Sequence, residues 1–187
     1  MSTPATGANA RPAADAGPLG YLALGLTLLA FGLLQTGIVS GAGTKDASSL
    51  ALFVGGVVLL LAGMWQFRHG EGFTATAFTG LGAFWAAWSA GADAVVGKNG
   101  AGLFLLLWAL LTLTLAAASW QSGRFSQGVY GLLTVALVLL AIATWADSGG
   151  LGKAAGWVAA VSGLLSWYGA TATLTNAAWG RAALPMK

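Results

Sequence analysis

Long apolar runs without a charged side chain alternate with short polar segments along this chain of 187 residues. Each run has about 20 residues, the length that an α-helix needs to cross a hydrocarbon core of ~30 Å. The runs are continuously apolar and rich in Leu and Ala, whereas membrane β-barrel strands alternate in polarity over about 10 residues. The sequence therefore predicts an all-α membrane protein, a six-helix transmembrane bundle with helices at 17–39, 50–67, 73–91, 101–120, 126–146 and 154–175.

The segments outside these runs are short and predict one domain. Residues 1–16 are small, polar and rich in Ala and Pro, and they lack the apolar stretch of a signal peptide, so a disordered N-terminal tail is expected. Asp15 and Pro18 suit the start of the first helix. The transmembrane domain is expected at 17–175 and a short C-terminal tail at 176–187, and the short loops leave no room for an extramembrane domain.

The composition argues against several classes of function. Hydrophobic residues make up 57% of the chain and charged residues 7%, whereas soluble domains carry about 25% charged residues. The chain has no Cys and one His, His69, which argues against a thiolate or multi-histidine metal site. No paired carboxylates lie within the runs. We therefore expect no enzyme, no metal and no cofactor, and the scattered Lys and Arg argue against a nucleic-acid partner.

Basic residues indicate how the chain is oriented, because Lys and Arg are enriched in cytoplasmic loops. Placing successive loops on alternate sides of the bilayer puts more basic residues on the side of the termini. This predicts cytoplasmic termini in a multi-pass protein of the cytoplasmic (inner or plasma) membrane. The side of the termini has Arg11, Arg68, Arg124, Arg181 and Lys187, and the other side has Lys45, Lys98 and Lys153.

Small and polar residues predict close helix packing and self-association. The chain has 29 glycines, and spacings such as Gly152-x-x-x-Gly156 and Gly82 with Ala86 let helix backbones approach closely. On the last run, two polar stripes fall on roughly opposite sides of a helix, which predicts protein or water on both sides, as in an oligomer. Hydroxyls that bond back to their own helix are the alternative. The stripes are Ser162, Ser166, Gly169 and Thr173, and Tyr168, Thr171 and Thr175.

No run contains a Lys, Arg, Asp, Glu or His, and this favours one class of membrane protein. Proton-coupled pumps usually keep an Asp, Glu or His inside the membrane as a relay. A channel or channel-like carrier for a small solute, acting passively or with the solute's own proton, therefore fits better than a primary pump. A scaffold protein that transports nothing is the alternative from another class, since tight glycine packing alone would be enough for it.

Three motifs carry a resemblance to a known family. The segment GPLGY at 17–21 resembles the N-P-A-P-L-G-L signature of the acetate uptake transporter family, the succinate-acetate permeases. The segment GMWQFRHGEGFTATAFT at 63–79, continued by GAFW at 82–85, is similar to the family's block between its second and third helices. Near the C-terminus, L-x-N at 174–176, GR at 180–181 and LP at 184–185 resemble its L-N-E-x-x-G-R-x-x-L-P.

The resemblance implies a ring-shaped homo-oligomer, a hexamer, in which each protomer passes acetate and, for some members, succinate or other small carboxylates. It places the family's constriction on Leu24, Leu81 and Leu133. Two of these positions are aromatic in typical bacterial members, which puts the substrate range in question. The signature Asn is replaced by Asp15, and a carboxylate at that mouth would repel an anion unless it is neutralised or caps the helix.

Further residues are expected to hold a carboxylate along such a path. The positive N-terminal end of the first helix would offer backbone N–H groups near Leu19 and Gly20. Trp85 is expected to line the path, and four hydroxyls are expected to replace water around the substrate, those of Thr27, Thr76, Thr79 and Ser166. Within the same family, ammonium or another small solute is the alternative substrate.

Overall fold

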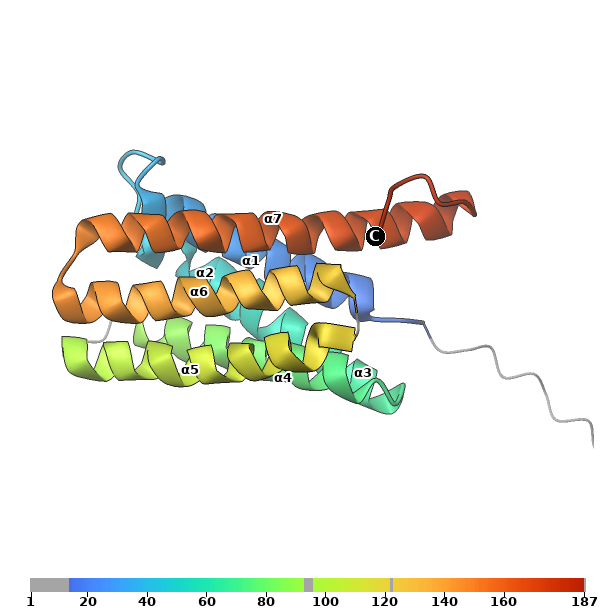
Figure 1. The fold of residues 1–187 in the computed structure, drawn as a ribbon, viewed down its shortest axis with the longest axis horizontal. Coiled ribbons are helices and arrows are strands. Elements are labelled where there is room, and N and C mark those ends of the chain that lie inside the picture. Colours follow the sequence, from blue (N-terminus) through green and yellow to red (C-terminus); the bar gives the residue numbers. More distant parts are fainter. Residues whose placement is uncertain (1–13, 93–95, 122, 187) are drawn as a thin grey trace, which may run out of the picture.

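The computed structural model describes residues 14–92, 96–121 and 123–186, and almost all of them lie in helices (Figure 1). Among these residues there is no β-strand, which confirms the all-α prediction. Residues 1–13 of the expected N-terminal tail lie outside the described residues. The helices are α1 (Gly17–Thr36), η1 (Thr44–Ala47), α2 (Ser48–Leu50), η2 (Ala51–Val58), α3 (Leu59–Arg68), α4 (Gly72–Gly91), α5 (Lys98–Ala118), η3 (Ser119–Gln121), α6 (Arg124–Ala146) and α7 (Gly149–Trp179).

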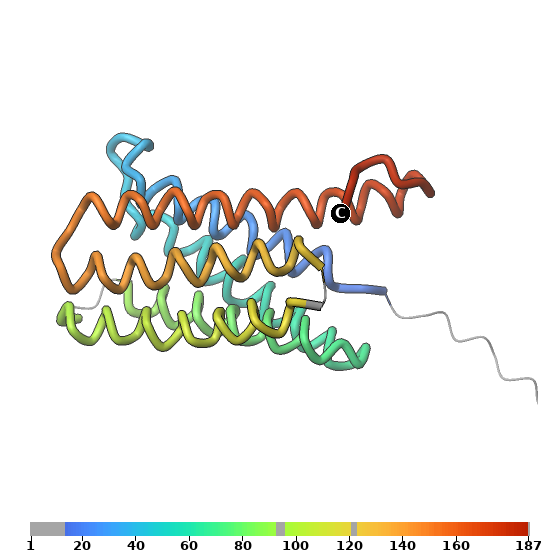
Figure 2. Tube along the Cα trace, in the orientation of Figure 1, coloured from blue at the N-terminus to red at the C-terminus, as the bar shows by residue number. Residues whose placement is uncertain are grey.

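Six long helical rods form the fold, because α2, η2 and α3 follow one another without a break. The rods pack as a ring in the order α1, α7, α6, α5, α4 and the rod from α2 to α3, which returns to α1. Figure 2 shows α7, α6 and α5 of this ring running side by side along the length of the bundle. The start of α1 and the end of α7 lie at the same end of the bundle, where α7 extends past α6 (Figure 1). Each predicted apolar run is thus one rod.

By length and composition, four helical segments of the described chain are apolar enough to cross a bilayer. They are Gly17–Thr36, Thr44–Arg68, Lys98–Ala118 and Arg124–Ala146, and they make this an integral membrane protein. The remaining two predicted spans, α4 and α7, are at least as long as α1 but do not meet the same hydropathy criterion. Both contain many Gly, Ala, Ser and Thr, whose small side chains lower hydropathy and favour close packing.

Glycines bring α1 and α7 into backbone contact. A Cβ added at Gly25 would lie 2.7 Å from the backbone nitrogen of Trp167, and one at Gly163 would lie 2.7 Å from that of Leu29. Real Cβ atoms do not approach backbone so closely, so a larger residue at either position would push the helices apart. Gly156 and Gly82, two glycines expected at helix contacts, also lie against neighbouring backbone.

Several hydroxyls of the polar stripes on α7 find partners within the protomer. The Ser162 hydroxyl donates to the carbonyl of Val129 and the Ser166 hydroxyl to that of Tyr21, each at 2.8 Å. The Tyr168 hydroxyl donates to the carbonyl of Pro185 at 2.9 Å, because the residues after α7 fold back along it. These three hydroxyls therefore do not require a neighbouring protomer.

Candidate functional site

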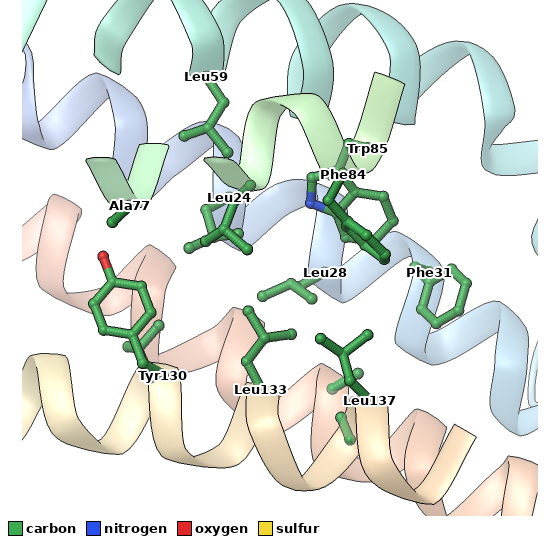
Figure 3. Close-up of a cluster of buried hydrophobic side chains, with 14 of the residues drawn as sticks. Leu24, Leu28, Phe31, Leu59, Ala77, Phe84, Trp85, Tyr130, Leu133 and Leu137 are labelled. Carbon is green, nitrogen blue, oxygen red and sulfur yellow. The ribbon is translucent and has the colours of Figure 1, made fainter. Parts of the chain in front are cut away.

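Leu24, Leu81 and Leu133, the three leucines expected at a constriction, belong to one buried cluster. They come from α1, α4 and α6, three helices of the ring, and each is at most 3% exposed. We refer to these three residues as the leucine cluster. Figure 3 shows Leu24 and Leu28 of α1 between Trp85 of α4 and Leu133 of α6. The structure thus places side chains from three helices together in the middle of the bundle.

The inner faces of these helices follow from their spacing. Buried large side chains recur every three or four residues on each helix, which puts them on one face. Without charged residues between them, the packed faces form a dry apolar centre. The positions are Leu24, Leu28 and Phe31 on α1, Phe78, Leu81 and Trp85 on α4, and Tyr130, Leu133 and Leu137 on α6.

Trp85 carries a polar group into this apolar centre. The side chain is 2% exposed, and its ring meets those of Phe31, Phe84 and Trp88 edge-on, with centroids 5.6, 5.0 and 5.9 Å away. Its indole Nε1 has no hydrogen-bond partner among the described residues. A buried donor without an acceptor is costly, so the site favours a ligand or a water that accepts a hydrogen bond there.

A π-helix packs against the Trp85 side chain. Residues Ala51–Val58 form η2, a π-helix of eight residues, and π-helical segments are frequent at functional sites. A Cβ at Gly55 would lie 2.8 Å from both Trp85 Cγ and Thr27 Cγ2, so the glycine leaves room for both side chains. The apolar pattern of this run missed both the π-helix and Gly55. The adjacent Gly55 and Gly56 inside an otherwise apolar run were the available signal.

Two neighbouring cavities lie along the bundle between its middle and one end. At the end away from the termini is a cavity of about 600 Å³, the distal vestibule. Beside Trp85 and Leu133 lies a cavity of about 20 Å³, large enough for about one water. The two share four lining residues, so they are neighbours along one route. The distal vestibule is lined by Phe31, Gln35, Thr44, Lys45, Ala87, Trp88, Gly91, Ala92, Val96, Gly100, Ala101, Phe104, Leu105, Leu140 and Thr144, and the shared residues are Phe31, Trp88, Leu105 and Leu140.

A third cavity, of about 300 Å³, lies at the opposite end, where α1 and α4 begin and α3 ends. We call it the terminal mouth. Tyr21 connects this mouth to the centre, because its ring lies 5.1 Å from that of Phe78 and its hydroxyl is 3.5 Å from that of Tyr130. Phe78 and Tyr130 belong to the same buried core as the leucine cluster. The terminal mouth is lined by Asp15, Gly17, Tyr21, Gln66, His69, Glu71 and Thr74.

The four hydroxyls expected along the path lie in different surroundings. The Thr27 hydroxyl donates to the carbonyl of Ala23 at 2.8 Å, and that of Ser166 is used on Tyr21. Thr76 bonds back to Gly72 on an exposed face of α4. Thr79 Oγ1 is buried without a partner among the described residues, and it lies against Gly63 of α3 rather than within the leucine cluster.

The start of α1 also differs from the expected arrangement. Leu19 is 51% exposed on the outside of the protomer. Gly20 is buried against the ring of Phe78, and its N–H donates to the carbonyl of Ala16 at 3.0 Å. The N–H of Gly17 donates instead to Asp15 Oδ1 at 2.8 Å. The Gly20 N–H is therefore already used within the helix, and the Leu19 side chain lies outside the leucine cluster.

Among the described residues, no group of three or more His, Cys, Asp or Glu side chains is placed to hold a metal ion. The chemistry that this arrangement offers is instead selective passage. An apolar centre hinders hydrated ions by dewetting, and a single aimed donor favours a solute with a hydrogen-bond acceptor.

Comparisons with known proteins show which proteins this chain resembles in sequence and fold. Residues 2–184 match the model of the GPR1/FUN34/yaaH family. The succinate-acetate/proton symporter SatP of Escherichia coli (strain K12) is 30% identical over 180 residues, which are 92% of this chain and 95% of that protein. The glyoxylate pathway regulator of Yarrowia lipolytica is 31% identical over 170 residues, which are 85% of this chain and 63% of that longer protein. The solved structure of the bacterial acetate channel SatP superposes with a TM-score of 0.86 at 29% identity, covering 93% of this chain and 99% of that one.

Proposed function

Because the chain belongs to the GPR1/FUN34/yaaH family, the acetate transporter family that its motifs resemble, we propose that it is a membrane channel or channel-like transporter for acetate and related short monocarboxylates. One observation supports this most strongly. An unpartnered indole N–H, that of Trp85, lies in an apolar centre between two cavities at opposite ends of the bundle. A small solute with an apolar methyl group and a hydrogen-bond acceptor suits this combination.

The proposed path runs from the distal vestibule, past Trp85 and through the leucine cluster, to the terminal mouth. A bare carboxylate pays several kcal/mol of desolvation in such surroundings, on the order of that for any unpaired buried ion. Two effects reduce this cost: a hydrogen bond from Trp85 Nε1, and a proton carried by the substrate itself. Since none of the predicted spans contains an Asp, Glu, His, Lys or Arg, a proton that crosses is expected to cross with the acid.

The leucine cluster is proposed to set the substrate range. Leu is more compact than the aromatic residues typical at two of its positions and has no hydroxyl, so this passage is wider but no more polar. Acetate and lactate then pass more readily than the doubly charged succinate, which would need two desolvated carboxylates. Leu81→Tyr should move the preference toward that of a typical family member.

Assembly and orientation are parts of the same proposal. We infer a ring-shaped homo-oligomer, a hexamer, in the cytoplasmic membrane with both termini in the cytoplasm. The excess of Lys and Arg in the segments that the sequence assigns to the side of the termini supports the orientation. Because the chain has no Cys, single cysteines introduced at Thr44 and Arg181 can report the two sides by labelling in intact cells. Native mass measurement in several mild detergents tests the ring, and a monomer in all of them would rule it out.

Uptake of labelled acetate into proteoliposomes tests the function. Purified protein should raise uptake above that of empty liposomes, and unlabelled lactate should compete better than succinate. Competition by ammonium but by none of the acids would assign the chain to the alternative substrate class. Uptake equal to that of empty liposomes would contradict acetate transport and would favour the alternative of a non-transporting scaffold protein.

A further inference from the structure

The terminal mouth holds a carboxylate that belongs to the protein. Asp15 Oδ1 accepts one hydrogen bond from the N–H of Gly17 at 2.8 Å and another from Gln66 Nε2 at 2.7 Å. The two donors come from different elements, the first turn of α1 and the last turns of α3. They converge on one oxygen at the helix end where backbone N–H groups favour a negative charge.

An aspartate side chain is an acetate group joined to the backbone through its methyl carbon. A site that holds the Asp15 carboxylate therefore has the donors needed to hold acetate. The resemblance to the substrate extends to size, because the site accommodates one carboxylate and one methylene. This makes Asp15 an internal competitor for any acetate that enters the terminal mouth.

The amide of Gln66 provides a second, independent observation. Gln66 is 2% exposed, and its Oε1 is buried without a hydrogen-bond partner among the described residues. A carboxamide presents a donor and an acceptor side by side, which complements the carbonyl and hydroxyl of an undissociated carboxylic acid. Asp15 as a carboxylate uses the donor and leaves the acceptor unused. A protonated substrate acid would use both.

We propose that Gly17 N–H and the Gln66 carboxamide form a binding site for the carboxyl group of the substrate, and that Asp15 occupies it as a tethered ligand until substrate displaces it. This deepens the proposed function and rests on it. The mouth is closed to anions by its own carboxylate when substrate is scarce and opens as substrate accumulates. Glu71 lines the same cavity, but no hydrogen bond of its side chain to this donor pair is found, so it adds charge without competing for the site.

Removing the tethered ligand should increase apparent affinity. A short tether gives a group an effective concentration in the millimolar range, so its loss should lower the acetate concentration for half-maximal uptake by about 2- to 10-fold. Asp15→Ala should show the full effect. Asp15→Asn keeps an oxygen that accepts both bonds, but a neutral acceptor binds more weakly, so it should fall between wild type and Asp15→Ala.

Two further variants distinguish competition by Asp15 from a general effect of negative charge in the mouth and from loss of folding. Glu71→Gln removes a negative charge from the same cavity without freeing the donor pair, so it should lower the half-saturation concentration less than Asp15→Ala does. Gln66→Met removes the amide at similar length and should raise the half-saturation concentration. In the Gln66→Met background, Asp15→Ala should then have little further effect, because the site for which Asp15 competes is already lost.

The experiment is labelled acetate uptake into proteoliposomes over a range of acetate concentrations, with wild type, these single variants and the double variant, each checked for folding by circular dichroism. The expected result is a half-saturation order of wild type, Asp15→Asn and Asp15→Ala from highest to lowest, with Glu71→Gln closer to wild type than to Asp15→Ala. If wild type transports acetate and Asp15→Ala has the same half-saturation concentration, the tethered-ligand proposal alone is overturned. It is also overturned if Glu71→Gln lowers the half-saturation concentration as much as Asp15→Ala does. Absence of uptake by folded wild type would overturn the proposed function and this inference with it.

Discussion

Replacing Trp85 by Phe removes one hydrogen-bond donor from the apolar centre while keeping an aromatic ring there. Because Trp85 Nε1 has no partner among the described residues, the change breaks no hydrogen bond within the described protein. Folding should therefore lose only part of the packing of the larger ring, well below the about 3–5 kcal/mol that truncation of Trp to Ala costs. The larger effect should fall on substrate passage.

The size of that effect depends on the species that the indole N–H meets. A hydrogen bond between neutral groups contributes about 0.5–1.5 kcal/mol, and one to a charged group about 1.5–3 kcal/mol. At about 1.36 kcal/mol per tenfold, loss of the bond raises the half-saturation concentration by about 2- to 12-fold for the neutral acid and about 12- to 150-fold for the carboxylate. The measured factor thus identifies the protonation state of the bound substrate.

The assay is acetate uptake into proteoliposomes over a wide concentration range. The matched control is Trp108→Phe, because Trp108 packs against Phe84 from α5 and does not line any of the three cavities described above. The reasoning is refuted by a Trp85→Phe protein that folds, assembles and has wild-type half-saturation. It is equally refuted if the control variant shows the same loss.

Three other substitutions test packing, selectivity and the C-terminal fold-back. Leu133→Ala should increase lactate uptake relative to acetate, and its cost in unfolding free energy should stay near the lower end of about 2–5 kcal/mol if water enters the enlarged space. Gly163→Leu should prevent stable folding by separating α1 from α7, whereas Gly131→Leu, with open space around it, should leave the melting temperature nearly unchanged. Asn176→Ala removes three hydrogen bonds to residues 183 and 184, so trypsin should cleave after Arg181 faster than in wild type, with acetate uptake unaffected.

The helices could be predicted closely because their cause is local. The third apolar run was expected at 73–91 and forms α4 at Gly72–Gly91, and the first was expected at 17–39 and forms α1 at Gly17–Thr36. Both ends of α1 follow residue chemistry, with Pro18 in the first turn and a left-handed Gly37 as the C-cap. The last helix runs on to Trp179, beyond the expected Thr175, since no Gly or Pro stops it before Gly180.

Features that depend on contacts between distant segments could not be predicted in this way. The π-helix around Gly55 reflects the packing of Trp85 and Thr27 against it, which no single run encodes. The hydrogen bond from Gln66 to Asp15 joins residues 51 positions apart. The helical periodicity likewise predicted which hydroxyls share a face of α7, but it could not predict their hydrogen-bond partners. For Ser162, Ser166 and Tyr168 these partners are backbone carbonyls of the same protomer.

The most direct test of the account is to block the passage at the leucine cluster. The chain has no cysteine, so Leu133→Cys gives one reactive thiol in the proposed path. Proteoliposomes with this variant are treated with benzyl methanethiosulfonate, whose adduct is bulkier than the native leucine, modification is followed by mass, and acetate uptake is measured before treatment, after it, and after reduction, with wild type as the control. The account predicts that uptake falls on modification, recovers on reduction and is unaffected in wild type. Complete modification with unchanged uptake would show that acetate does not pass between these leucines.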